Sequence, residues 1–236
     1  MSTFFAEAES NSELMIKGIF SYQIFGQTVW ITSTHISVLI LVLIILGIAF
    51  AANRCMKRAQ EVPGTFQNLL ELAVEKLDGI VENSLGSNSP RFRNYISTIF
   101  VFILFCNLGS MFGMRAPSAD YGVTLPLGIL SFLIIQINGI RSQKWGYLKD
   151  LATPIPLTPI NVIGEVAVPI SLSLRLFGNV LSGTMIMGLW YSMMPALAKI
   201  FVSPFLHAYL DLFSGCIQTY VFCMLTMTYL SNKISE

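Results

Sequence analysis

A single arginine interrupts an otherwise apolar stretch of the chain. In "SLRLFGN", residues 173–179, Arg175 lies in a region where the only other charged residue between Asp150 and Lys199 is Glu165. Placing a charge at the centre of a bilayer costs between about 2.5 and 17 kcal/mol, depending on how the cost is measured. Such a residue persists where water or an opposite charge compensates it. Arg175 is therefore the first candidate for a site that handles ions.

Polar residues accompany Arg175 along two predicted helices. Ser171 and Asn179 lie one helical turn from Arg175 on the same face, and Ser182 lies two turns from it. A second stripe lies within one sector of the last apolar run, and its members are His207, Asp211, Ser214, Gly215 and Gln218. Two polar stripes on consecutive long apolar helices predict a shared seam that water can enter.

Each polar residue also has a structural interpretation. Asp211 could be the acid that offsets Arg175, or it could pair with His207 at i, i+4. Each serine could bond to the backbone of its own helix, so the pattern carries more weight than any one hydroxyl. Glu165 lies about 15 Å along a straight helix from Arg175, so it is no direct partner and could instead line an ion entrance.

The composition indicates a membrane protein. Of 236 residues, 54% are hydrophobic and 11% are charged, against about 25% charged in an ordinary soluble domain. The alternating pattern of a membrane β-barrel is absent, and helices are the other way to satisfy the backbone in lipid. We therefore expect an all-α polytopic protein with about five membrane-embedded helices and no role in nucleic-acid binding.

A single membrane domain, residues 1–236, is expected. Its expected parts are an extracytoplasmic N-terminal segment (1–35), a first span (36–52), an amphipathic surface helix (64–84), the second and third spans (96–140) and a region (155–232) that contains two long apolar runs. A run of about 40 residues makes about 60 Å of helix, twice the apolar thickness of a bilayer. The runs in the last region must therefore tilt, bend or fold back.

The distribution of basic residues predicts the orientation. With the amino terminus outside, ten of the 14 Lys and Arg residues fall on the cytoplasmic side: six in 53–95, three in 141–149, and Lys233. Three fall outside, namely Lys17, Arg115 and Lys199. Because basic residues favour the cytoplasmic side, five crossings with a cytoplasmic carboxyl terminus are expected.

The residues around Arg175 resemble a known family. "PISLSLRLFGNVLSGTMIMG" resembles the signature of subunit a of the F-type ATP synthase membrane sector, in its bacterial type. The stretch "TPINVIGEVAVPISLSLRLFGN" and the closing "IQTYVFCMLTMTYL" follow in the family's order. The resemblance implies an ion-translocating stator subunit, in which two aqueous half-channels couple transmembrane H⁺ flow to c-ring rotation and ATP synthesis. It also implies that residues 155–232 form a long inclined hairpin against the c-ring.

The resemblance implies roles for the polar residues. Arg175 matches the essential arginine that makes a passing c-ring carboxylate release its ion and blocks leakage between the half-channels. Asn179 and Gln218 match polar positions beside it, and Glu165 matches a recurring acidic position. The full set of expected ion-translocation residues is Arg175, Asn179, Gln218, Asp211, Glu165, His207, Ser171, Ser182, Thr184 and Ser214.

The resemblance also implies the setting of the chain. The expected partners are the c-ring, the b-subunit of the peripheral stalk, the catalytic head through the assembled complex, and membrane lipid. The expected location is the plasma membrane, crossed several times. We expect no cofactor, no stable metal site and no catalytic site in the chain itself.

The coupling ion has two interpretations. Thr184 stands where many relatives have glutamate, and Asp211 where many have histidine or glutamate. A path rich in Ser, Thr, Asn and Gln with few titratable groups strengthens the case for a transient Na⁺ path, because sodium needs oxygen ligands. H⁺ is the first expectation, and Na⁺ in the same role is the alternative.

Two readings from other classes are disfavoured. An intramembrane protease could use Ser182 or Ser214 with His207, but neither a GxSG nor a GxGD motif is present. An independent secondary transporter would be expected to show repeated halves, and the sequence has none. The chain also lacks a nucleotide-binding loop.

Overall fold

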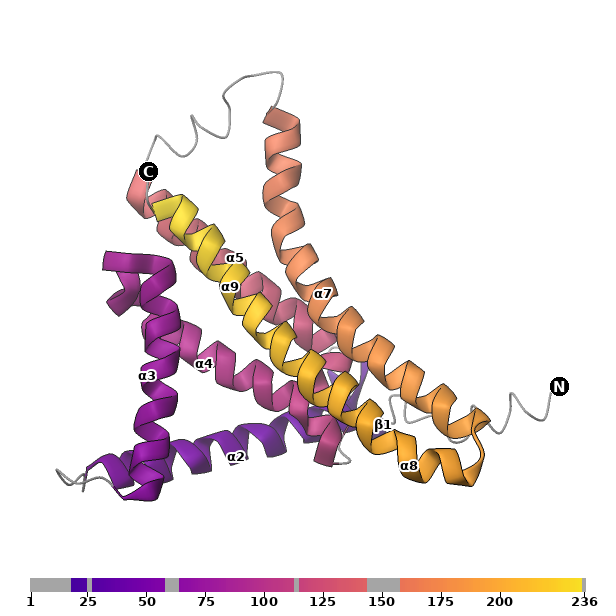
Figure 1. The fold of residues 1–236 in the computed structure, drawn as a ribbon. Coiled ribbons are helices and arrows are strands. Elements are labelled where there is room, and N and C mark those ends of the chain that lie inside the picture. The colour runs from indigo at the N-terminus through magenta and orange to yellow at the C-terminus, as the bar shows by residue number, and fades with distance from the viewer. Residues whose placement is uncertain (1–17, 25–26, 58–63, 113–114, 144–157, 235–236) are drawn as a thin grey trace.

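The computed structural model describes residues 18–24, 27–57, 64–112, 115–143 and 158–234. Residues 1–17 of the expected N-terminal segment and residues 155–157 of the expected hairpin lie outside this part of the chain. Within it, five helices are long and apolar enough to cross a membrane. This confirms the prediction of an all-α polytopic membrane protein (Figure 1).

The five helices follow one another along the chain, and two of them are composite. They are α2 (Ser33–Met56); α3 (Thr65–Leu85) continued by η1 (Gly86–Asn88) and α4 (Ser89–Leu108); α5 (Tyr121–Gln143); α7 (Thr158–Met193); and α8 (Ala196–His207) continued by the π-helix η5 (Ala208–Phe213) and α9 (Ser214–Ile234). Two short 3-10 turns, η2 (Gly109–Phe112) and η3 (Pro117–Ala119), precede α5.

The bend between α3 and α4 has a local cause. Gly86 has a φ of 54°, the left-handed conformation that commonly ends a helix. Pro90 then occupies the first turn of α4, where its missing N–H is tolerated. The two helices consequently diverge in direction (Figure 1), and the C-terminal end of α3 packs against the inclined bundle of α4, α5, α7 and α9 through Val81 and Leu85.

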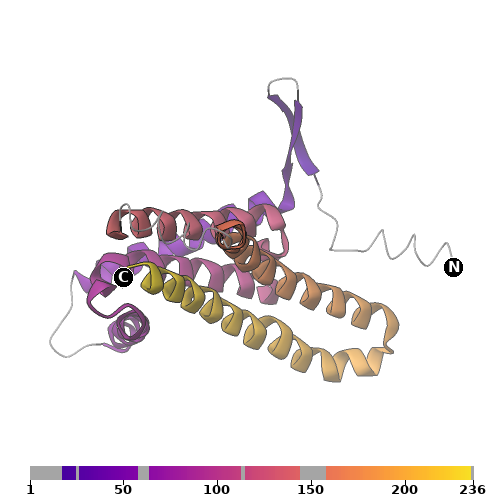
Figure 2. The ribbon, with the colours of Figure 1, turned by 90° about the horizontal axis from the view of Figure 1, so that it is seen from above.

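A β-hairpin precedes α2 and was not predicted from the sequence. Strands β1 (Gly18–Ile24) and β2 (Gln27–Thr32) pair antiparallel, with Tyr22 opposite Val29. Aromatic and β-branched residues, which favour strands, are frequent in both. The hairpin projects away from the helices (Figure 2), so it adds an element outside the bundle and leaves the helical class of the bundle unchanged.

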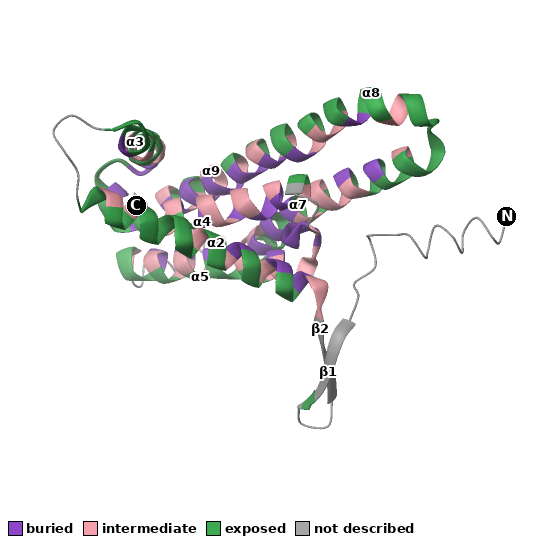
Figure 3. Ribbon diagram, turned by 90° about the horizontal axis from the view of Figure 1, so that it is seen from below, coloured by how far each residue is buried: buried purple, intermediate pink, exposed green. Residues whose placement is uncertain are grey.

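The apolar core lies at one end of the inclined bundle. Its buried members from α7 and α9 are Leu172, Leu176, Phe222, Cys223, Met227 and Leu230, packed against residues of α3, α4 and α5. The C-terminal part of α7 from residue 178, together with α8, extends beyond this core; we call it the distal arm. In Figures 2 and 3 the distal arm projects from the other helices and is largely exposed.

Large apolar side chains make up much of the exposed surface of the distal arm. Leu189 is 61% exposed, Phe201 69% and Phe205 77%. Such exposure is expected of a helix that faces lipid or a partner subunit. The distal arm is therefore a surface that the described part of the chain leaves uncovered.

Helices α5 and α7 approach each other closely at Gly128. A Cβ atom added there would lie 2.7 Å from the carbonyl oxygen of Pro169 and 3.1 Å from the Cβ of Ser173. The first neighbour is backbone and has little freedom to move away. Only glycine allows the two helices to approach this closely, so Gly128 fixes the position of α7 on the bundle.

Replacing Gly128 by alanine should separate α5 from α7. Because overpacking a tight contact costs about 1–3 kcal/mol, the Gly128→Ala chain in detergent should melt at a lower temperature than the parent. Gly47→Ala is the matched control, since a Cβ at Gly47 meets nothing within 4 Å. The control should melt at or above the parent temperature because alanine favours helix. Equal melting of Gly128→Ala and the parent would contradict the close contact.

Candidate functional site

The site lies along the antiparallel contact between α7 and the helix formed by α8 and α9. Trp190 Nε1 donates to Ser203 Oγ at 3.1 Å. Ser214 Oγ donates to Asn179 Oδ1 at 3.0 Å, and Asn179 Nδ2 donates to the carbonyl of Ser214 at 3.4 Å. Between these two contacts both helices advance by 11 positions in opposite directions. The seam predicted between the two helices therefore has a defined register.

Arg175 and Gln218 share one level of this register. Arg175 precedes Asn179 by one turn on α7, and Gln218 follows Ser214 by one turn on α9. Arg175 is exposed and makes no hydrogen bond or ion pair with any described residue. The Gln218 side chain is only 8% exposed, and its Nε2 has no hydrogen-bond partner among the described residues. The Arg175 guanidinium, which has no polar partner among the described residues, and the unsatisfied buried amide of Gln218 thus lie at the same level along the hairpin.

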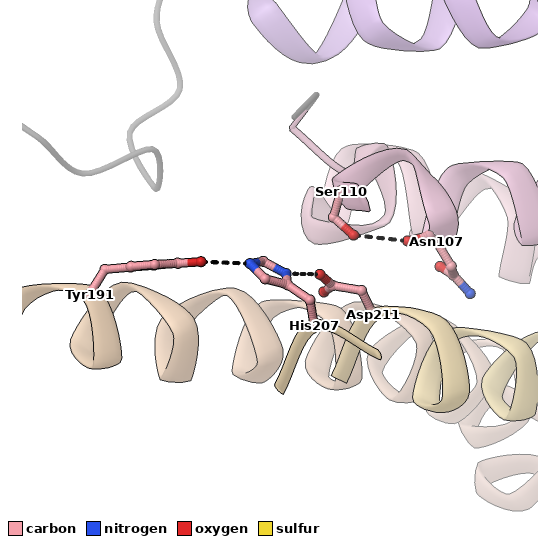
Figure 4. A network of polar contacts seen from close by, with 5 residues as sticks. All are labelled: Asn107, Ser110, Tyr191, His207 and Asp211. Carbon is pink, nitrogen blue, oxygen red and sulfur yellow. Dashed lines mark hydrogen bonds and ion pairs between the residues drawn. The ribbon is translucent and has the colours of Figure 1, made fainter. Parts of the chain in front are cut away.

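Asp211 pairs with His207 and not with Arg175. Its Oδ2 lies 2.5 Å from His207 Nδ1, and His207 Nε2 lies 3.0 Å from the hydroxyl of Tyr191 (Figure 4). The Asp211 side chain is 9% exposed and that of His207 is 37% exposed. These three side chains form a continuous hydrogen-bonded chain from the exposed end of α7 to a buried carboxylate. Of the two interpretations of Asp211, the i, i+4 pair is the one observed.

A π-helix sets the position of Asp211. Residues Ala208–Phe213 form η5, in which the wider i→i+5 turn replaces the α-helical turn between α8 and α9. Pro204 lies one turn earlier, in α8, and has no N–H to donate to the carbonyl of Ile200, so the α-helical bonding is already interrupted before η5 begins. Asp211 is the one buried residue of η5. The π-helical turn η5 therefore places the Asp211 carboxylate in a buried position between the two helices.

Asn107 anchors α9 next to this turn. Its Nδ2 donates to the carbonyl of Gly215 and to Thr219 Oγ1, each at 3.1 Å. Its Oδ1 accepts a hydrogen bond from Ser118 Oγ at 2.7 Å. The side chain is 2% exposed, so these bonds are made in the interior. Ser110 Oγ donates to the carbonyl of Asn107 at 3.2 Å, as Figure 4 shows.

Glu165 lies in a second polar cluster at the other end of the hairpin. Lys233 Nζ donates to Glu165 Oε1 at 2.5 Å, and Gln136 Nε2 donates to Oε2 at 2.8 Å. The side chains of the ion pair are about equally half-buried, at 22% for Glu165 and 23% for Lys233. Three helices, α5, α7 and α9, therefore converge on one carboxylate.

The remaining predicted residues do not join either cluster. Ser182 Oγ donates to the carbonyl of Asn179 at 2.9 Å, and Thr184 Oγ1 donates to that of Leu181 at 2.8 Å. Both hydroxyls therefore satisfy their own helix, which the structural interpretation predicted for Ser182 and which Thr184 shares. Ser171 is exposed and has no hydrogen-bond partner in the described part of the chain.

Four residues of these clusters were not among the predicted site residues: Tyr191, Gln136, Lys233 and Asn107. The spacing of polar residues along α7 could not identify Tyr191, because its hydrogen-bond partner, His207, lies on the other arm of the hairpin. Gln136 stood out as a polar residue within an apolar span. Lys233 stood out only as a charge near the carboxyl end. A cross-helix register would have been needed to connect them.

Comparison with known proteins identifies the family. The family described as "ATP synthase A chain" matches residues 35–231. A protein of Moorella thermoacetica described as "ATP synthase subunit a" is 34% identical, over 86% of this chain and 91% of its own length. One of Propionigenium modestum, "ATP synthase subunit a, sodium ion specific", is 32% identical over 94% of this chain and 78% of its own length.

A third relative, "ATP synthase subunit a" of a Sulfurihydrogenibium species, is 30% identical over 86% of this chain and 97% of its own length. The match with the family covers every described helix that carries the seam, from α2 to most of α9. With its five apolar helices and its two polar clusters about Arg175, the chain belongs to the ATP synthase subunit a family, the membrane subunit described as the A chain.

Proposed function

We propose that the chain is the ion-translocating stator subunit of an F-type ATP synthase, with Arg175 as its essential fixed charge. The observation that carries the proposal is the exposed guanidinium without a polar partner among the described residues. A charge in an apolar helix needs a compensating group, and here that group must come from outside the described chain. A carboxylate on a passing c-ring subunit meets this need and can release its ion as it pairs with Arg175.

The two polar clusters are suited to serve as the mouths of two half-channels. Glu165 precedes Arg175 on α7 by roughly 15 Å, and Tyr191 follows it by roughly 24 Å. The clusters therefore lie at opposite ends of the hairpin, with the arginine between them. An ion that enters at one cluster would have to bind to a c-ring subunit before it could leave at the other cluster. The direct route between the clusters is closed because Arg175 repels cations.

The polar residues between the clusters line the proposed path. Asn179, Ser214 and Gln218 place oxygen and nitrogen atoms at the level of Arg175 or one turn from it. Ser171, Ser182 and Thr184 supply hydroxyls on α7. The apolar distal arm supplies the surface on which the c-ring turns.

The same proposal covers the assembly. The b-subunit of the peripheral stalk would hold the chain stationary against the catalytic head, which performs the ATP chemistry. The chain itself would have no catalytic site. The balance of basic residues supports a plasma-membrane orientation with the amino terminus outside and the carboxyl terminus in the cytoplasm.

We propose H⁺ as the coupling ion. The chain from Tyr191 through His207 to Asp211 favours it, since a phenol, an imidazole and a carboxylate can pass a proton along hydrogen bonds. Na⁺ is the second candidate, and the observation that favours it is the relative of Propionigenium modestum whose description is sodium ion specific.

Replacing Arg175 tests the proposed role of the arginine. In Arg175→Ala, ion-driven ATP synthesis by vesicles should fall below detection, while the complex still assembles because the side chain has no polar partner among the described residues to strand. Arg54→Ala, which removes an exposed arginine at the end of α2, should retain parental synthesis. Coupled synthesis by Arg175→Ala would overturn the proposal.

Dependence on sodium distinguishes the two ions. ATP hydrolysis by the purified complex should be the same with and without added Na⁺ at fixed pH, and proton pumping should be complete in its absence. Stimulation of hydrolysis by Na⁺, together with Na⁺ uptake into vesicles, would replace H⁺ by Na⁺ in the proposal and leave the role of Arg175 unchanged.

The hydroxyl of Tyr191 tests the proton chain directly. Removing one neutral hydrogen bond costs about 1 kcal/mol, which is a factor of about five. Tyr191→Phe should therefore lower proton-driven synthesis about fivefold without loss of assembly. Tyr209→Phe is the matched control, because Tyr209 is 61% exposed and its ring stacks on Phe213. Equal rates in the two variants would contradict a proton path through Tyr191.

A further inference from the structure

The β-hairpin is joined to the first membrane helix without a linker. Strand β2 ends at Thr32, and α2 begins at Ser33. The hydroxyl of Thr32 forms a hydrogen bond of 2.7 Å with His35 Nδ1, in the first turn of α2. A junction without a linker residue and with a side-chain bond across it leaves the hairpin little freedom to turn. The level and the direction of the hairpin are therefore set by α2.

The hairpin begins at the level of the lipid headgroups. Helix α2 has 24 residues, which make about 36 Å of helix, longer than an apolar bilayer core of about 30 Å. Its residues 33–35 are polar, and its exposed apolar residues start at Ile36. Figures 2 and 3 show that the hairpin runs across the direction of α5, one of the candidate spans, and not along it. A hairpin with this origin and direction lies along the membrane surface.

The sequence of the hairpin suits the boundary between lipid and water. Residues 18–32 contain no Asp, Glu, Lys, Arg or His. Tyr and Trp favour this boundary, and the two strands contain Tyr22 and Trp30. Because the strands carry no charge, electrostatic attraction to an acidic or basic partner has no group to act on. The hairpin offers apolar and aromatic residues alternating with hydroxyls and amides instead.

The register of the two strands separates apolar from polar positions. Alternate residues of a strand lie on the same face of the hairpin, and directly paired residues share a face. We call one face the apolar face; its members are two cross-strand pairs, Phe20 with Ile31 and Tyr22 with Val29. The opposite face carries Gln23 paired with Thr28 and Ser21 paired with Trp30, and Gln23 is exposed.

We propose that the hairpin is an interfacial anchor whose apolar face lies on the surface of the lipid bilayer. The inference goes beyond the proposed function, since it needs a bilayer but neither a rotor nor a coupling ion. Continuity with the surface of α2 favours lipid as the occupant, because Leu39 and Leu43 on that helix are each 59% exposed. Helix α2 buries three residues, all in its first nine positions: Thr34, Ser37 and Leu41. An anchor at this end would fix the depth of a helix that the bundle holds weakly.

The test places a tryptophan on each face in turn. Full-length chain carrying Trp30→Phe is reconstituted in phosphatidylcholine vesicles, with Val29→Trp on the apolar face or Gln23→Trp on the opposite face. The emission of the two other tryptophans is subtracted with the Trp30→Phe chain. Val29→Trp should lose its emission to lipid brominated on the acyl chains and should emit at shorter wavelength. Gln23→Trp should lose its emission to acrylamide in the water.

Two results of this measurement would overturn the inference. One is loss of the Val29→Trp emission to acrylamide as strong as that of Gln23→Trp, which would place both faces in water. The other is protection of Val29→Trp from both quenchers, which would mean that protein and not lipid covers the apolar face. Ile31→Trp lies on the same face and replaces Val29→Trp if that variant does not reconstitute.

A charge on the apolar face supplies a second measurement. Phe20→Glu should abolish the quenching of Val29→Trp by brominated lipid, because a carboxylate disfavours contact with the acyl chains. Ser21→Glu is the matched control, since Ser21 neighbours Phe20 in β1 and lies on the opposite face. The control should leave the quenching by brominated lipid unchanged. Equal quenching in the two variants would show that lipid does not distinguish the faces and would contradict the anchor.

Discussion

An apolar helix whose guanidinium has no polar partner among the described residues must leave one of its faces uncovered by them. The fold of α7 follows from this constraint. On one side, Gly128 lets α5 approach the backbone at Pro169, and Leu172 and Leu176 enter the core. On the other side Arg175 stays exposed. Packing is therefore concentrated at one end of α7, and the rest of the helix is held mainly by its antiparallel neighbour.

The two polar ends of the hairpin are built from different chemistry. At one end a phenol, an imidazole and a buried carboxylate form a hydrogen-bonded chain, arranged by a π-helical turn. At the other end a carboxylate is balanced by an ammonium and an amide from two further helices. A path that is proposed to carry one kind of ion thus begins and ends in surroundings with different electrostatics.

Much of the fold could be predicted from the sequence, because helices that cross a membrane are encoded by length and apolar composition. Arg175 could be identified for a related reason, since a lone charge in such a run is conspicuous. The β-hairpin was missed, because short strands beside a long apolar run carry a weaker signal than the helix. The π-helix was missed because it differs from an α-helix by about one residue in a turn, which the spacing of His207 and Asp211 does not reveal.

Contacts across the hairpin were the hardest to predict. Helical periodicity says which residues share a face of one helix and is silent on the register between two helices. Tyr191 with His207, and Glu165 with Lys233, join segments far apart in sequence. The spacing of polar residues grouped Ser182 and Thr184 with the seam, yet both bond to their own backbone. Local patterns thus identified the helices of the site more reliably than its individual contacts.

The distal arm also has a mechanical meaning. A hairpin that is packed at one end and projects freely at the other behaves as a cantilever (Figure 2). A sideways load on the tip of the hairpin produces its largest bending moment where the hairpin joins the bundle. The close contact at Gly128 and the ion pair of Glu165 with Lys233 lie at that supported end. These contacts therefore form the fixed support against any sideways load on the distal arm.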